Sequence, residues 1–205
     1  MKRVAIIKAG EHPDLAKSAI QRMSEAKSFK AYEQGWVEFL AQASRFYSKL
    51  EQGAKGCEKS TPWFGKKKHE RRKDSLLSYI HHARDCEEHT IDYTASITAE
   101  MLQGQLPEEG DFKMSCTFML DKNGKQHFRN IKATGPDGED LPVELVNPQL
   151  ALTTVYDRRF GDHFDPPTVH LTRPIVDTTP RGIASLAIQY LEGMLEEARN
   201  LPQHF

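Results

Sequence analysis

Apolar side chains recur every three or four residues between positions 29 and 50 of this chain. On a helix with about 3.6 residues per turn, this spacing places them along one face. The stripe consists of Phe29, Tyr32, Trp36, Phe39, Leu40, Ala43, Phe46, Tyr47 and Leu50. Because a long apolar face is stable only when other elements cover it, the first part of the chain is predicted to be a helical bundle.

Two further helices are expected around this stripe. A shorter one before it is expected from Leu15, Ile20 and Met23, with its start at Pro13 and Asp14. Another is predicted to begin near Asp74 or Ser75, both of which can cap a helix N-terminus. Its apolar spacing continues beyond His89, so a single helix and a second helix after a kink both remain open.

The apolar period falls toward two at about residue 105, which indicates strands. Residues 114–120 and 126–133 flank an Asn-Gly pair, which favours the tight turn of a β-hairpin. Further short strands are expected between residues 143 and 171. A last helix should follow Thr179, a good N-cap residue, with Pro180 in its first position.

The predicted fold class is therefore α+β, a helical bundle with a small antiparallel sheet inserted before the C-terminal helix. The expected boundaries are 1–105 for the helical region, 106–178 for the β insertion and 179–205 for a helix that packs back on the bundle. An inserted sheet of this size needs a helix to cover its apolar face, so its expected role is structural.

Composition excludes several classes of protein. With 28 Lys or Arg against 29 Asp or Glu, the chain has a net charge of -1, which argues against an indiscriminate nucleic-acid binder. Three cysteines without a C-x-x-C pair support neither a disulfide framework nor a zinc ribbon, so a cytoplasmic location is expected. The apolar run at residues 4–7 is far shorter than the about 20 residues that span a bilayer, so no membrane partner is expected.

The charges are nevertheless unevenly distributed. Residues 55–73 contain eight Lys or Arg and two Glu, a local excess of six positive charges that the rest of the chain offsets. Such a patch can bind phosphates, and the adjacent Trp63 could stack on an unpaired base. The residues proposed to bind a nucleic acid are Trp63, Lys66, Lys67, Lys68, Arg71, Arg72 and Lys73. The alternative is a solvated loop anchored by its aromatic residues.

A second cluster follows, from Arg84 to His89. An arginine can stabilise charge that develops on a phosphate, and a histidine can transfer a proton near neutral pH. On a straight helix the two residues lie about 140° apart, so one helix does not easily direct both at one phosphate. Two copies that meet at a symmetric interface would remove this difficulty, and Asp85 is placed to orient the imidazole of His89.

The same stretch allows two other interpretations. His82, Cys86 and His89 share a helix face that could ligate a metal, but no fourth ligand occurs at a familiar spacing. No metal is therefore assigned. The charged residues could also form ordinary surface ion pairs, which contribute little to stability.

The stretch from Asp74 to His89 resembles the HEPN domains (higher eukaryotes and prokaryotes nucleotide-binding), which are small helical bundles. Many of them carry an R-x(4 to 6)-H motif near the end of the third core helix. Arg84 and His89 match it with four intervening residues, and Asp85 stands where family members often place a polar residue. The resemblance covers about residues 28–100 and leaves out the predicted sheet.

This resemblance implies a homodimer in which two motifs form one cleft and cut single-stranded RNA without a metal or other cofactor. His89 would act as acid or base and Arg84 would stabilise the phosphorane, while Asp85 completes the catalytic set. A role in toxin or phage-defence systems, with an antitoxin or another defence protein as partner, is typical of such proteins. The alternative is a catalytically silent HEPN module that dimerises or binds nucleotides, since not every family member is a nuclease.

Overall fold

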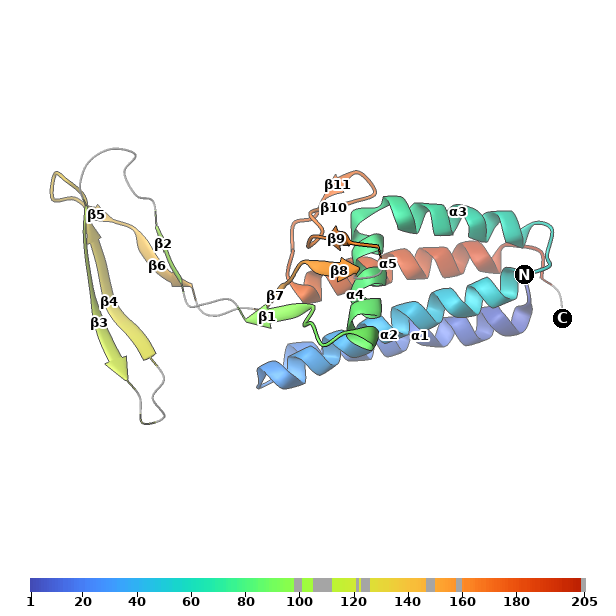
Figure 1. Cartoon of the computed structure of the whole chain (residues 1–205), viewed down its shortest axis with the longest axis horizontal. Helices are drawn as coiled ribbons and strands as arrows, with labels where there is room; N and C mark the ends of the chain where they lie inside the picture. Colours follow the sequence, from blue (N-terminus) through green and yellow to red (C-terminus); the bar gives the residue numbers. More distant parts are fainter. Residues whose placement is uncertain are drawn as a thin grey trace. The chain divides into compact units, whose positions relative to one another are not determined.

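The structure is a computed structural model that describes residues 1–97, 101–104, 112–120, 122, 126–146, 150–157 and 160–203. The chain forms two compact units, which are distinguished in Figure 1 by their content of helices and strands. The first unit combines Met1–Ser96 with Leu150–Phe205, and the second covers Ile97–Gln149. All described helices belong to the first unit.

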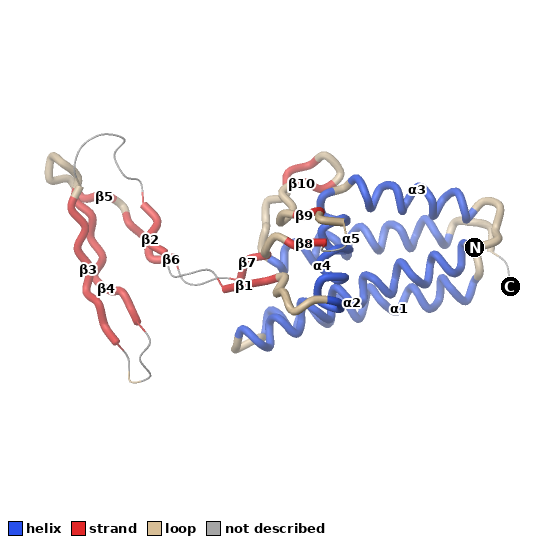
Figure 2. The backbone as a smooth tube through the Cα atoms, in the orientation of Figure 1, coloured by secondary structure: helices blue, strands red, loops and turns tan. Residues whose placement is uncertain are grey.

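Five described helices build the first unit: α1 (Arg3–Glu25), α2 (Phe29–Ala54), α3 (Ser60–Lys73), α4 (Ser75–His89) and α5 (Pro180–Arg199). Helices α1, α2, α3 and α5 run along the length of the unit, and α4 crosses them near one end (Figures 1 and 2). The predicted mixture of a helical region, small antiparallel sheets and a C-terminal helix is thus confirmed. None of the described helices is both long and apolar enough to cross a membrane.

Helix α2 matches the predicted apolar stripe. Ser28 caps it by accepting a hydrogen bond from the backbone N–H of Ala31, and three of the large side chains in the middle of the stripe are fully buried. Trp36, Phe39 and Phe46 are each 0% exposed, and Trp36 stacks on Phe39 with ring centroids 5.3 Å apart. Burial of such a ring contributes about 2–3 kcal/mol, so these rings stabilise the bundle.

Helix α1 begins earlier than the sequence predicts. The expected start at Pro13 is wrong, because the helix begins at Arg3 and Pro13 lies buried in its interior. Buried Ala9, Ala16 and Ala19 form a face of small residues that lets α1 pack closely on α2. This packing compensates for the backbone hydrogen bond that an interior proline removes, a loss of about 3 kcal/mol.

The basic run is helical, so its interpretation as a solvated loop is also wrong. It forms α3, which ends where Asp74 adopts an extended backbone conformation. The side chain of Asp74 then accepts a hydrogen bond from the N–H of Leu77 and caps α4, which confirms the predicted start of that helix. Helix α4 ends at His89 and does not continue toward Met101.

Short strands complete the first unit: β1 (Ala95–Ile97), β7 (Leu150–Leu152), β8 (Val155–Asp157), β9 (Asp162–Phe164), β10 (Val169–His170) and β11 (Arg173–Pro174). They pair as β1 with β7, β8 with β9 and β10 with β11. Strands β8, β9 and β10 pack on α4. The second unit ends at Gln149, whereas the expected insertion extended to residue 178. The later strands belong to the first unit, because Leu152 and Val155 are buried in the helical core.

The second unit contains β2 (Met101–Gly104), β3 (Lys113–Leu120), β4 (Gln126–Thr134), β5 (Asp140–Leu141) and β6 (Val143–Val146). The predicted hairpin is confirmed by the antiparallel pairing of β3 with β4, in which Met114 lies opposite Ala133. Its Asn-Gly turn lies outside the described residues. Strand β5 extends this sheet beside β4, and β2 pairs with β6. Figure 2 shows these strands in red.

Candidate functional site

Helix α4 positions the residues of the predicted motif. Leu76, Leu77, Ile80 and Ala83 are buried and fix one side of the helix in the core. The start of α4 is held firmly, because the cap residue Asp74 also accepts hydrogen bonds from the ring of His170, at 2.9 Å, and from the N–H of Leu171, at 2.7 Å. The orientation of the other faces of α4 relative to the bundle is therefore fixed.

Arg84 is paired within its own helix. Its guanidinium donates to Asp85 Oδ1 at 2.9 Å and lies 2.5 Å from Glu88 Oε2. Two carboxylates thus compensate its charge, and a phosphate would have to displace one of them. Glu87, which lies between Arg84 and His89, instead accepts hydrogen bonds from the backbone N–H and hydroxyl of Thr94.

A groove of about 480 Å³ runs along another side of α4, toward its C-terminal end. It is lined by His82, Asp85, Cys86, His89, Thr90, Tyr156, Asp157 and Phe160. Two of the three predicted catalytic residues, Asp85 and His89, therefore share one hollow. Arg84 does not line it, as the angle of about 140° between positions 84 and 89 on a helix predicts.

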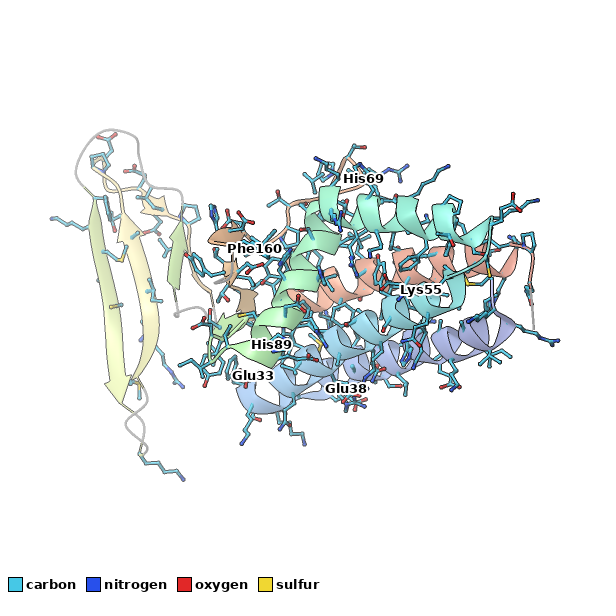
Figure 3. All side chains as sticks on the ribbon, turned by 45° about the vertical axis from the view of Figure 1, so that its right-hand side comes forward. Glu33, Glu38, Lys55, His69, His89 and Phe160 are labelled. Carbon is cyan, nitrogen blue, oxygen red and sulfur yellow. The ribbon has the colours of Figure 1, made fainter. Side chains whose placement is uncertain are left out.

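The hairpin of β8 and β9 forms the other wall of this groove. Tyr156 and Phe160 are 58% and 69% exposed, so their rings are accessible to a ligand. Figure 3 shows His89 near the end of α4 and Phe160 to one side of the same helix, next to the strands. An exposed aromatic ring is a suitable surface for stacking an unpaired base.

His82 also lines the groove, although the sequence had indicated it only as a possible metal ligand. Its ring stacks on Phe164, with centroids 3.6 Å apart and planes 9° apart, and its Nδ1 lies 3.8 Å from Asp157 Oδ2. Burial lowers the pKa of His82 and outweighs the opposing effect of Asp157. The imidazole is therefore neutral at neutral pH and can accept a proton.

The alternative of a metal site gains no geometric support in the part of the chain that the structure describes. No three His, Cys, Asp or Glu side chains are placed there to hold a metal ion. Of the three residues on the suspected face, Cys86 is buried and its sulfur lies 3.2 Å from the hydroxyl of Thr90.

Much of the basic run holds the bundle together. Lys67 is only 12% exposed and lies 2.8 Å from Glu197 on α5, and the indole N–H of Trp63 donates to the same carboxylate at 2.9 Å. Lys68 pairs with Glu51 on α2 at 2.9 Å. These side chains join α3 to its neighbours. Trp63, Lys67 and Lys68, which were predicted to bind RNA, therefore have a structural role in the bundle.

Arg71 is likewise directed inward. Its guanidinium lies over the ring of Tyr47, 4.6 Å from the centroid, and burial lowers its pKa. Lys66, Arg72 and Lys73 remain exposed. The predicted basic surface is thus reduced to these three residues.

Comparison of the chain with protein-family models, curated proteins and solved structures finds no match in any of the three. A functional assignment therefore depends on the residues themselves and on the geometry of the groove.

Sequence reasoning missed His82, Tyr156 and Phe160 as members of the site. The placement of β8 and β9 against α4 depends on contacts between distant parts of the chain, which no local sequence pattern indicates. The local signal for His82 was its position on the same helix face as Cys86 and His89.

Proposed function

We propose that this protein is a metal-independent endoribonuclease that cleaves single-stranded RNA as a homodimer. The observation that carries the proposal is the groove at the end of α4, which combines two imidazoles, two carboxylates and two exposed aromatic rings. These are the groups that RNA cleavage by proton transfer needs, together with a surface for an unpaired base.

In the proposed reaction, the 2'-hydroxyl of the substrate attacks the adjacent phosphorus. The bond from the 2'-oxygen to phosphorus forms while the bond from phosphorus to the 5'-oxygen breaks, and a cyclic phosphate remains. His82, whose lowered pKa keeps it neutral, accepts the proton of the 2'-hydroxyl. His89 donates a proton to the departing 5'-oxygen, and Asp85 stabilises the imidazolium form.

Arg84 of a second copy completes the site in this proposal. Within one chain, Arg84 lies outside the groove that contains His89, so a twofold axis near α4 is needed to bring the partner's guanidinium to the phosphate. The guanidinium would exchange its contact with Glu88 for the developing charge on the phosphorane. A toxin or phage-defence role, with an antitoxin or another defence protein as partner, is part of this proposal.

A second candidate is a catalytically silent module that dimerises or binds nucleotides. It is favoured by the two ion pairs that occupy the guanidinium of Arg84, at 2.9 Å from Asp85 and 2.5 Å from Glu88. The groove would then bind a base between its aromatic rings without cutting the strand.

Cleavage of single-stranded RNA in the presence of EDTA distinguishes the two functions. We expect the parent protein to cut, and the His89→Ala variant to cut about 10²–10⁴-fold more slowly because it lacks one proton-transfer group. The matched control is His69→Ala, which removes an exposed histidine on α3 far from the groove (Figure 3) and should leave the rate unchanged. RNA binding without cleavage by the parent would favour the silent module, and equal rates for the parent and His89→Ala would contradict the nuclease.

A further inference from the structure

A second hollow lies on a different face of α4, inside the bundle. It is lined by Leu40, Ala43, Ser44 and Tyr47 from α2, Arg71 from α3, Leu77, Ile80, His81 and Arg84 from α4, and Ala187 and Leu191 from α5. Its volume is about 20 Å³, which is enough for one occupant of about the size of a water molecule. Most of its wall is apolar, so its few polar groups determine what it can hold.

Those polar groups include two donors without an acceptor. The Nε atoms of Arg71 and Arg84 are buried, and among the described residues neither has a hydrogen-bond partner. Arg84 uses its two terminal nitrogens for Asp85 and Glu88, which leaves Nε–H free. Buried donors are normally paired, because they lose their hydrogen bonds to water on folding.

The charge of Arg71 is the one beside this hollow that no ion pair compensates in the part of the chain that is described. Arg84 also lines the hollow, but Asp85 and Glu88 pair with its guanidinium. Burial and the nearby Arg71 lower the pKa of His81 to about 4, in spite of the opposing effect of Asp85. An occupant that accepts hydrogen bonds and carries negative charge would satisfy both the donors and the field.

We propose that this cavity is a binding site for one small monovalent anion of halide size, with chloride as the natural occupant, held by the Nε–H groups of Arg71 and Arg84. A phosphate group, with four oxygens around phosphorus, exceeds the volume of the cavity. Part-exposed His81 and Arg84, with side chains 37% and 28% exposed, form the rim through which the ion enters. The bound ion would tie the arginine of the motif to α3.

Thermal unfolding in sodium chloride or sodium bromide, compared with sodium gluconate at the same ionic strength, tests this site. Gluconate is too large for the cavity, so only the halides should raise Tm. We expect Tm to rise with the logarithm of the halide concentration, by about 5 °C when the halide exceeds its dissociation constant a hundredfold. Arg71→Lys keeps the positive charge but lacks Nε–H, and should lose most of the rise. Arg72→Lys makes the same change at an exposed neighbour and should retain it.

Crystals grown in bromide provide an independent readout, since bromide scatters anomalously. We expect one peak between Arg71 and Arg84. Equal Tm in halide and gluconate, an equal halide effect in Arg71→Lys and the parent, a response to inorganic phosphate alone, or no bromide peak would each overturn the proposal. None of these outcomes depends on RNA cleavage, so the anion site and the proposed nuclease can fail separately.

Discussion

Arg84 and Asp85 are neighbours in the chain, but they belong to different faces of α4. His81 and Arg84, three residues apart, line the small cavity inside the bundle. His82, Asp85 and His89 follow a spacing of three and four residues and line the outer groove. A shift of one residue, about 100° around the helix, therefore separates Arg84 from Asp85, and Arg84 and His89 lie about 140° apart.

The titration of His81 should be visible in the stability of the protein. Burial and the charge of Arg71 lower its pKa from 6.5 to about 4, whereas Asp85 acts in the opposite direction and His82 and Arg84 lower it further. As the pH falls, His81 is therefore protonated in the unfolded chain at a higher pH than in the folded protein. The stabilisation is complete above about pH 6.5 and is lost as the pH falls toward 4.

Urea unfolding at pH 7.5 and pH 5 measures this effect. After a discount for the partial exposure of the ring, we expect the parent to lose about 1 kcal/mol more than His81→Gln between the two pH values. His69→Gln, which replaces an exposed histidine, should behave like the parent. If His81→Gln loses as much stability as the parent, His81 is not the titrating group.

At the scale of elements, strong local signals identified α2, α4, α5 and the β3–β4 hairpin from the sequence. Thr179 caps α5 as predicted, by accepting a hydrogen bond from Gly182 at 3.1 Å. The early start of α1 escaped prediction because its buried face consists largely of alanine, which gives a weak apolar period. Helix α3 escaped because charged residues such as Lys67 and Arg71 cover its inner side with their aliphatic stems.

The close contact of α1 with α2 depends on Gly35. A Cβ at this position would lie 2.6 Å from Met23 Cγ and 3.1 Å from the carbonyl oxygen of Ala19, so the backbones of the two helices would have to separate. We expect Gly35→Ala to cost about 1–2 kcal/mol of unfolding free energy, because overpacking outweighs the gain in helix propensity.

Gly65→Ala is the matched control, since it makes the same change inside α3 with nothing within 4 Å of the new Cβ. It should stabilise the protein by about 0.5–1 kcal/mol through helix propensity alone. Chemical denaturation of both variants checks the pair. Equal effects of the two substitutions would show that α1 and α2 are not packed as closely as described.

At the scale of the whole molecule, the strands that were expected to form one insertion divide between two units. Residues 150–174 belong with the helices because Leu152 and Val155 are buried in the bundle core, and the outer groove depends on this placement. Contacts between residues so far apart in the chain leave no local pattern, which is why the sequence predicted the motif but not the complete groove. The sequence was sufficient to propose Arg84, Asp85 and His89 as site residues, but it did not indicate Tyr156 and Phe160.

The first unit should fold without the second. Strand β1 pairs with β7, so residues 96 and 150 lie in neighbouring strands whose spacing is about 5 Å, and a short Gly-Ser turn can join them. We expect a chain without residues 97–149 to keep its helical circular dichroism and a single cooperative thermal transition. Loss of cooperativity would show that the bundle depends on the second unit.

The central claim is that each RNA-cleaving site combines Arg84 from one copy with His89 from the other, so that a dimer has two such sites. Arg84→Ala and His89→Ala should each be inactive alone, and mixing equal amounts, with subunit exchange verified by different affinity tags, should restore activity. Half of the dimers would then be mixed, and one of their two sites would be intact, so the expected rate is about one quarter of the parent rate. Verified mixed dimers without RNA cleavage would contradict the shared site.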